Sequence, residues 1–216
     1  MKTHEISANP GNVHWGFFDY NLKPVMTIRS GDRLVANTLS GHPDLLPKDK
    51  KRIPSELIAI HANTEKGLGP HILLGPVNVE GAKPGNVLEI RIEKIKPRVD
   101  WAYNRLAPMA GALPDDFSRQ NSRIIDLDLK RNSAEVAPGW RVPLRPFFGI
   151  LGVCPPRGLG RIPSNPPYVH GGNMDNKELV AGSTVYLPIW KNGAGFSVGD
   201  GHAAQGDGEV DQTAVE

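Results

Sequence analysis

Glycine and proline recur along the whole chain and limit the folds that it can adopt. The 216 residues include 24 glycines and 20 prolines, and both residue types destabilise the interior of a helix. A helix bundle or a coiled coil is therefore excluded. Between these residues, apolar and charged side chains alternate with the period of two that is typical of half-buried strands.

Several segments show this alternation. The clearest is residues 87–95, and residues 122–129 repeat the pattern. Residues 26–39 predict two strands joined by a bend or a hairpin. Two more strands are predicted in residues 183–190 and 195–198, because the Lys-Asn-Gly sequence between them is typical of a tight turn. The chain is therefore expected to be mainly β.

Helical signals are few by comparison. Pro54, followed by good helix formers, predicts one short helix within residues 53–61. Proline and glycine recur too often in residues 97–121 and 138–173 for long elements, so extended loops are expected there. No linker or internal repeat divides the chain. These features predict a single domain over residues 1–216, mainly β with minor helix (α+β).

Charge and hydropathy exclude several classes of protein. The 25 Lys and Arg and the 23 Asp and Glu residues leave a net charge of +2, which argues against a nucleic-acid partner. The longest apolar run, residues 147–154, is far shorter than the ~20 residues of a membrane-spanning helix. Cys154 is the only cysteine, so no disulfide forms within the chain. With no apolar signal sequence after Met1, we expect a cytoplasmic protein without a membrane partner.

Two features favour association of copies of the chain. Hydrophobic residues make up 39% and aromatic residues 6% of the sequence, which is a lean core. Residues 210–216 are expected to form a strand without an evident partner, and a second chain could cover such an edge. We therefore expect a homo-oligomer.

The densest group of reactive side chains lies in residues 199–209. This segment contains four glycines, three carboxylates, one histidine and one amide. Glycine leaves room beside a bound group, and Asp, Glu and His are ligands that divalent metals prefer. The alternative is a solvated turn in which Asp and Gly only shape the backbone. The adjacent histidine and the small Ala203–Ala204 pair favour a binding site.

Two further segments place a histidine beside a predicted strand. His170 is followed by two glycines, Asn173 and Asp175, and His71 enters an apolar run. Each histidine taken alone is more often a structural residue that bonds the backbone. Three such segments could nevertheless converge on one metal ion.

These residues resemble the acetamidase/formamidase family. The resemblance is carried by residues 170–175, 182–188 and 199–209, and upstream by residues 75–85. It extends from about residue 30 to the end, and its most specific part is the Gly-Asp-Gly-His-Ala-Ala-Gln sequence in the third of these segments.

The resemblance implies both a fold and an activity. The fold would be a β-sandwich or barrel-like structure with some helix, in a homo-oligomer. The activity would be hydrolysis of a small amide substrate, such as formamide or acetamide, to ammonia and a carboxylate. The cofactor would be a divalent metal, zinc with calcium as the alternative. Family members typically continue further, so a C-terminal portion of the family's fold is expected to be absent from this chain.

The chemistry of amide hydrolysis suggests roles for several of these residues. An amide carbonyl is a poor electrophile, and a metal both polarises it and lowers the pKa of bound water to about 7. We expect Asp200 and His202 to hold the ion together with His71 or Asp175. Glu209 is expected to act as the general base that moves the water proton to the leaving ammonia.

Other residues are candidates for contact with the substrate. The Asn173 side chain, or the backbone N–H groups of Gly171 and Gly172, could stabilise the tetrahedral oxyanion. His170 and Gln205 complete the expected substrate-binding set.

Two alternatives remain open at this stage. The chain could be a non-enzymatic β module that binds a metal or a small ligand without turnover. It could also be a hydrolase of a cyclic amide, since nothing in the sequence distinguishes a formamide pocket from one that takes a lactam.

Overall fold

The computed structural model describes residues 1–216 and is built almost entirely from strands. In chain order the elements are β1 (Thr3–Ser7), β2 (Val13–Trp15), β3 (Phe17–Asp19), β4 (Met26–Ile28), β5 (Arg33–Asn37), the 3-10 turn η1 (Lys50–Arg52), α1 (Ser55–Asn63), β6 (Ile72–Val79), β7 (Val87–Arg91), β8 (Trp101–Leu106), β9 (Asn121–Asp128), β10 (Ser133–Ala137), β11 (Trp140–Pro143), β12 (Phe147–Gly152), the 3-10 turn η2 (Arg157–Leu159), β13 (Arg161–Pro163), β14 (Gly171–Asn173), β15 (Thr184–Pro188) and β16 (Phe196–His202).

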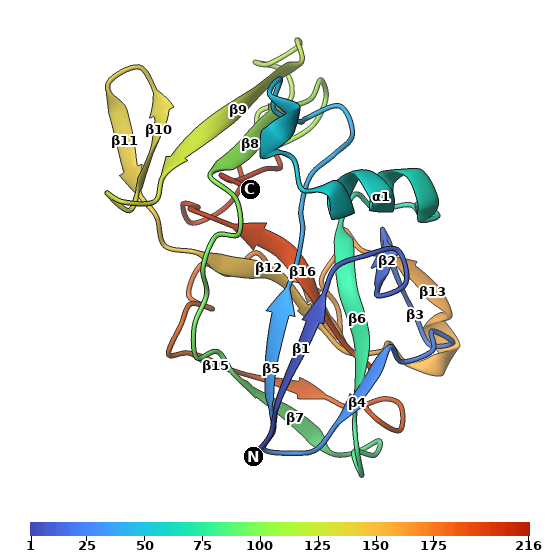
Figure 1. Ribbon diagram of the computed structural model, residues 1–216. Helices are drawn as coiled ribbons and strands as arrows, with labels where there is room; N and C mark the ends of the chain where they lie inside the picture. Colours follow the sequence, from blue (N-terminus) through green and yellow to red (C-terminus); the bar gives the residue numbers. More distant parts are fainter.

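The largest sheet runs through the middle of the molecule (Figure 1). Its strand order is β14-β12-β16-β6-β2, and β4 adds to β6 in parallel. Strand β16 lies at the centre, antiparallel to both β12 and β6. Ile150 of β12 pairs with Gly199 on one side and with Asn173 on the other. This sheet therefore brings the late, glycine-rich part of the chain against strands from its first half.

Four smaller sheets surround the large one. The order β11-β10-β9-β8 forms an antiparallel sheet, whose β10–β11 hairpin lies at the outer edge of the molecule (Figure 1). Strands β1 and β5 pair in parallel, whereas β7–β15 and β3–β13 are antiparallel pairs. Most partners are distant in sequence, so the fold depends on long-range pairing.

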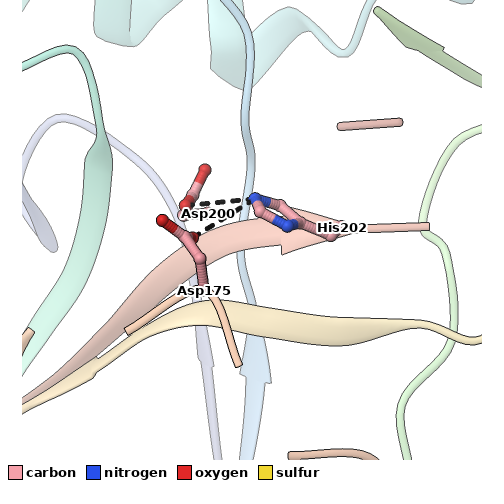
Figure 2. Close-up of side chains that lie close together, drawn as sticks. All are labelled: Asp175, Asp200 and His202. Carbon is pink, nitrogen blue, oxygen red and sulfur yellow. Dashed lines mark ion pairs between the residues drawn. The ribbon is translucent and has the colours of Figure 1, made fainter. Parts of the chain in front are cut away.

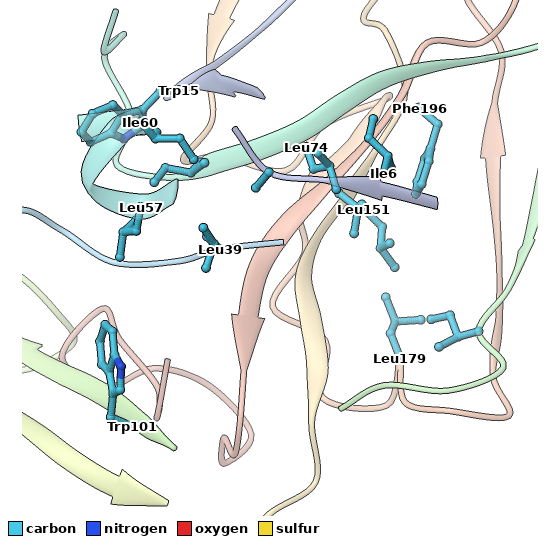
Figure 3. Packing of buried hydrophobic residues seen from close by; sticks show 14 residues of the cluster. Ile6, Trp15, Leu39, Leu57, Ile60, Leu74, Trp101, Leu151, Leu179 and Phe196 are labelled. Carbon is cyan, nitrogen blue, oxygen red and sulfur yellow. The ribbon is translucent and has the colours of Figure 1, made fainter. Parts of the chain in front are cut away.

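The main core cluster extends along the large sheet, from α1 at one end to Leu179 at the other (Figure 3). Leu57 and Ile60 stand three residues apart on one face of α1 and are fully buried. They belong to the same apolar cluster as Trp15, Leu74 and Leu151. Full burial of a leucine or isoleucine side chain stabilises a fold by about 1.5–3 kcal/mol. The one α-helix is thus held by its apolar face. No helix is long and apolar enough to cross a membrane.

Local sequence patterns predicted several elements. The structure confirms a mainly β fold with minor helix, with strands β7 and β9 where the alternation is clearest. Helix α1 begins directly after Pro54, as expected. In these segments the side-chain period alone is sufficient, because it depends only on residues close in sequence.

The local turn sequences do not determine which strands pair. Strands β15 and β16 form on either side of the Lys-Asn-Gly turn, yet they do not pair; β15 binds β7 and β16 binds β12 and β6. Likewise β4 and β5 are joined by a bend and not by a hairpin, since they pair with β6 and β1. Long-range partners that bury apolar faces outweigh the local turn signal.

Three segments differ from expectation. Residues 97–121 were expected as loop but contain β8, and residues 138–173 contain β11, β12, β13 and β14. The strand expected at residues 210–216 is wrong: only Val215 forms an isolated bridge, to Ala204. Short strands with glycine or proline lack the alternating signal, because their side chains contribute little to the pattern.

Candidate metal centre

The end of β16 carries two of the predicted metal ligands. Asp200 and His202 are two residues apart, and both side chains are buried. His202 Nε2 lies 3.2 Å from Asp200 Oδ2. The two side chains point toward one another across the end of the strand, as Figure 2 shows. Gly201 between them donates its backbone N–H to Ser40 Oγ at 3.1 Å, which ties this end of β16 to the loop after β5.

Asp175 reaches the same place from the segment that follows β14. Its Oδ1 lies 3.9 Å from His202 Nε2 (Figure 2), and its backbone N–H donates to the carbonyl of Gly149 at 3.2 Å. Asp175 and Asp200 have φ angles of 43° and 56°. Positive φ is unfavourable for most residues and concentrates at functional sites. Both carboxylates are therefore presented by a strained backbone.

His71, just before β6, completes the predicted set. Its Nε2 lies 4.0 Å from Asp200 Oδ2, and its Nδ1 lies 2.8 Å from Ser164 Oγ. The structure thus brings together all four residues that the sequence suggested as ligands, from three separate segments of the chain.

Two glutamates approach His202 from the other side. The Oε1 atoms of Glu209 and Glu216 lie 3.7 and 3.9 Å from His202 Nε2. Glu216 also accepts a hydrogen bond from the Tyr103 hydroxyl. Sequence reasoning proposed Glu209 but missed Glu216 and Tyr103. Tyr103 and Glu216 are held side by side by two backbone hydrogen bonds, of 2.8 and 3.1 Å. A contact between residues so far apart in the sequence cannot be predicted from a local pattern.

Burial and mutual repulsion raise the pKa values of three of the carboxyl groups. The pKa of Asp175 rises to about 6 through burial and the charge of Asp200. That of Glu209 rises to about 7 through burial and Asp175. Burial and Asp200 raise the pKa of Glu216 to about 8. Three crowded carboxyl groups with raised pKa values indicate a site that a cation would stabilise.

The central histidine shifts in the opposite sense. Burial disfavours its charge, but Asp200, Glu216 and Glu209 outweigh burial and raise the pKa of His202 to about 10. Burial likewise acts against the charge of Asp200, yet His202 and His71 hold the pKa of this carboxyl below its usual value. Asp200 is therefore the carboxylate most firmly ionised in the cluster.

The cluster has both the donors and the space for a metal ion. Asp175 Oδ1, His202 Nε2 and Glu209 Oε1 are buried and have no hydrogen-bond partner, whereas buried polar atoms are normally paired. Gly149 of β12 provides the space: a Cβ there would contact Asp200 Oδ2 and lie 2.6 Å from Asp175 Oδ1 and 3.1 Å from His202 Nε2. Imidazole and carboxylate donors suit zinc, and carboxylate oxygens suit calcium. A divalent cation fits this arrangement.

Of the residues expected to bind substrate, one contacts the candidate metal ligands and the others lie on or beside β14. Gln205 lies at the cluster, where its Oε1 is 2.8 Å from His202 Nδ1 and its Nε2 donates to the carbonyl of Asp175 at 2.7 Å. Both polar ends of this amide therefore contact candidate ligand residues.

The other expected substrate contacts lie on or beside β14, which β12 separates from β16. The His170 ring is fully buried and packs edge-on against Phe18, with ring centroids 4.6 Å apart. The amide of Asn173 donates to the carbonyl of Asn165 at 3.0 Å. Gly171 donates its N–H to Tyr168 at 2.9 Å, and Gly172 lies in β14 with it. None of these contacts is with a carboxylate of the cluster, and Asn173 Oδ1 and both ring nitrogens of His170 are buried without a hydrogen-bond partner.

Known proteins are similar to this chain in sequence. The model of the Acetamidase/Formamidase family matches residues 20–165 and 161–216. A formamidase from Methylophilus methylotrophus is 28% identical, in an alignment that covers 65% of this chain and 47% of that protein. An acetamidase from Mycolicibacterium smegmatis is 26% identical, over 65% of this chain and 49% of that protein. The chain thus spans about half the length of these relatives.

A solved structure shares the fold. A predicted acetamidase/formamidase from Thermoanaerobacter tengcongensis superimposes with a TM-score of 0.82 at 29% sequence identity. The match covers 100% of this chain and 65% of that one. With the family match over nearly its whole length, the chain belongs to the acetamidase/formamidase family.

Proposed function

We propose that this chain carries the catalytic centre of a metal-dependent hydrolase that converts a small linear amide, formamide or acetamide, to ammonia and a carboxylate. The observation that carries the proposal is the convergence of Asp175, Asp200 and His202 on a space left free by Gly149. The membership of the family and the names of its relatives, formamidase and acetamidase, support the substrate class.

In this proposal Asp175, Asp200 and His202 hold a divalent cation, with His71 as the fourth donor. Zinc is the first choice, because two imidazoles with two carboxylates are a donor set that zinc accepts. Calcium is the alternative, since carboxylate oxygens make up much of the cluster. When bound, zinc would polarise the amide carbonyl and lower the pKa of bound water to about 7.

Glu209 is the proposed general base. Its Oε1 is buried, lacks a hydrogen-bond partner and lies 3.7 Å from His202 Nε2. Burial and the charge of Asp175 raise its pKa to about 7, which is the range in which a carboxylate can both accept and return a proton at neutral pH. Glu209 would take the proton of the attacking water and deliver it to the nitrogen of the leaving ammonia.

Glu216 and Tyr103 extend the same site. The Tyr103 hydroxyl donates to Glu216, so that the other carboxylate oxygen faces His202 at 3.9 Å. We propose that Tyr103 fixes this carboxylate as a further acidic group beside the cation. The charge of a bound cation would then favour the ionised form of Glu216, whose pKa burial and Asp200 raise to about 8.

The test is product release from formamide, acetamide and a five-membered lactam, with and without a chelator. We expect ammonia from the linear amides, loss of activity with the chelator and recovery with zinc. The lactam is assayed by its ring-opened amino acid, because it releases no ammonia. Hydrolysis of the lactam alone would contradict the proposed substrate class. No turnover by folded, zinc-loaded protein would contradict catalysis and favour a metal-binding or ligand-binding module.

A further inference from the structure

Gln205 connects two of the candidate ligands. It follows β16 by three residues and is half-buried. Its side-chain amide lies between the His202 ring and the Asp175 backbone, with 2.8 Å from Oε1 to His202 Nδ1 and 2.7 Å from Nε2 to the Asp175 carbonyl oxygen. These two contacts occupy the oxygen and the nitrogen of the amide.

The Asp175 carbonyl determines which way this amide faces. A carbonyl oxygen can only accept a hydrogen bond, so the NH₂ group of Gln205 must point to Asp175. The oxygen of Gln205 then faces His202, where it can only accept. His202 Nδ1 must therefore carry a proton and donate it to Gln205. In the neutral ring this leaves the lone pair on Nε2, the atom that faces Asp175 and Asp200.

From this geometry we propose that Gln205 is a positioning residue that fixes the tautomer and orientation of His202 for metal binding, and not a substrate contact. The inference rests on the proposed metal site. Gln205 also donates a hydrogen bond to the backbone carbonyl of Asp175. This bond holds the backbone of Asp175, whose φ is positive, in the conformation that presents its carboxylate. One side chain thus orients two ligands. Partners of this kind typically change metal affinity by about 10–100-fold when removed.

His71 provides a contrast within the same cluster. Its Nδ1 contacts Ser164 Oγ at 2.8 Å, and a hydroxyl can either donate or accept. The tautomer of His71 is therefore not determined by its partner. We expect Gln205 to contribute more to metal affinity than Ser164.

The experiment measures zinc affinity by competition with a chromophoric chelator, and kcat and KM for formamide at saturating zinc. Gln205→Leu removes both hydrogen bonds at similar volume. Gln205→Glu keeps the acceptor for His202 and loses the donor to Asp175. Gln120→Leu is the matched control, because Gln120 is exposed. Thermal unfolding of the zinc-free proteins shows whether each variant folds. If Gln205→Leu does not fold, Gln205→Glu is used for the comparison instead.

We expect the zinc affinity of Gln205→Leu to fall by about 10–100-fold, with partial recovery in Gln205→Glu and no change in Gln120→Leu. At saturating zinc, KM for formamide should stay close to the wild-type value, because a positioning residue does not touch the substrate. An unchanged zinc affinity with a raised KM would overturn the inference and make Gln205 a substrate contact. Wild-type protein that binds zinc yet releases no ammonia would overturn the proposed hydrolysis alone. Failure of the wild type to bind zinc would overturn both.

Discussion

A buried histidine lies at each end of strand β16: His14 of β2 contacts its start, and His202 is its last residue. Near its start, Ser197 contacts His14, whose Nδ1 donates to the Phe17 carbonyl at 2.6 Å and whose Nε2 lies 2.9 Å from Ser197 Oγ. At its end, His202 faces carboxylates, and its Nε2 has no hydrogen-bond partner. Both ring nitrogens of His14 are therefore hydrogen-bonded, whereas Nε2 of His202 has no hydrogen-bond partner.

The pKa values of the two rings follow from these surroundings. Burial outweighs the Phe17 carbonyl and the Asp19 charge and lowers the pKa of His14 to about 4. Carboxylates outweigh burial and raise the pKa of His202 to about 10. A buried polar atom without a partner costs about 1–3 kcal/mol of stability. His14 is therefore hydrogen-bonded through both ring nitrogens, whereas the unpaired Nε2 of His202 is the atom that a bound cation would satisfy.

The largest effect is expected from removing the base at the His202 end. Glu209→Gln should lower kcat by about 10²–10⁴-fold, the usual contribution of a general base, while zinc affinity stays near the wild-type value. Steady-state ammonia release and zinc competition measure the two quantities. Glu178→Gln is the matched control, since Glu178 forms only an exposed ion pair with Arg145. Loss of zinc from Glu209→Gln would move Glu209 into the ligand set and contradict its role as base.

The next effect concerns the protonation of His14. The pKa of His14 in the folded chain, about 4, lies below the ordinary value of 6.5. Between these two pH values the unfolded chain therefore binds a proton at His14 and the folded chain does not. The contribution of neutral His14 is complete above pH 6.5 and is lost as the pH falls toward 4. It should amount to about 3 kcal/mol of unfolding free energy.

Urea unfolding from pH 7 to pH 4 tests this, with wild type and His14→Gln compared at each pH. The difference between the two proteins isolates His14 from the carboxyl groups of the metal centre. It should shrink by about 3 kcal/mol over this range. A difference that does not vary with pH would show that His14 is not buried in its neutral form, and the contrast with His202 would fail.

A smaller effect is expected from the partner of His14. Ser197→Ala removes the hydroxyl that donates to Nε2 and leaves that nitrogen buried without a partner. The free energy of unfolding should fall by about 1–2 kcal/mol, with zinc affinity unchanged. Ser122→Ala is the control, because the buried Ser122 hydroxyl has no hydrogen-bond partner to lose. Equal effects of the two substitutions would argue that the His14–Ser197 bond adds no stability.

The sequence predicted the elements of this molecule better than their pairing. Strands β7 and β9 and helix α1 follow from periods that neighbouring residues determine. The order β14-β12-β16-β6-β2 does not, because each neighbour pair joins segments far apart in the chain. For the same reason the tight-turn sequence between β15 and β16 did not indicate their partners, which are β7 for β15 and β12 and β6 for β16.

The site was predictable to the extent that its residues cluster in sequence. Asp200, His202 and Glu209 stand in one glycine-rich segment, so their chemistry could be inferred before the fold. The role of Gly149 could not be predicted from the sequence. The chain has 24 glycines, and Gly149 differs from the others only in the side chains that a Cβ at its position would contact in the fold. Nor did the sequence single out His14, and only the fold places a carboxylate near His71.

The most direct test of the proposed metal centre is zinc titration of wild type, Gly149→Ala and Gly201→Ala. A methyl group at Gly149 would occupy the point where Asp175, Asp200 and His202 converge, whereas one at Gly201 would meet only Phe148, at 3.9 Å. Neither glycine has a positive φ, so alanine fits both backbones. We predict one zinc per chain in wild type and Gly201→Ala, and an affinity at least about 10-fold lower in Gly149→Ala. Wild-type affinity in folded Gly149→Ala would contradict a cation held at this point.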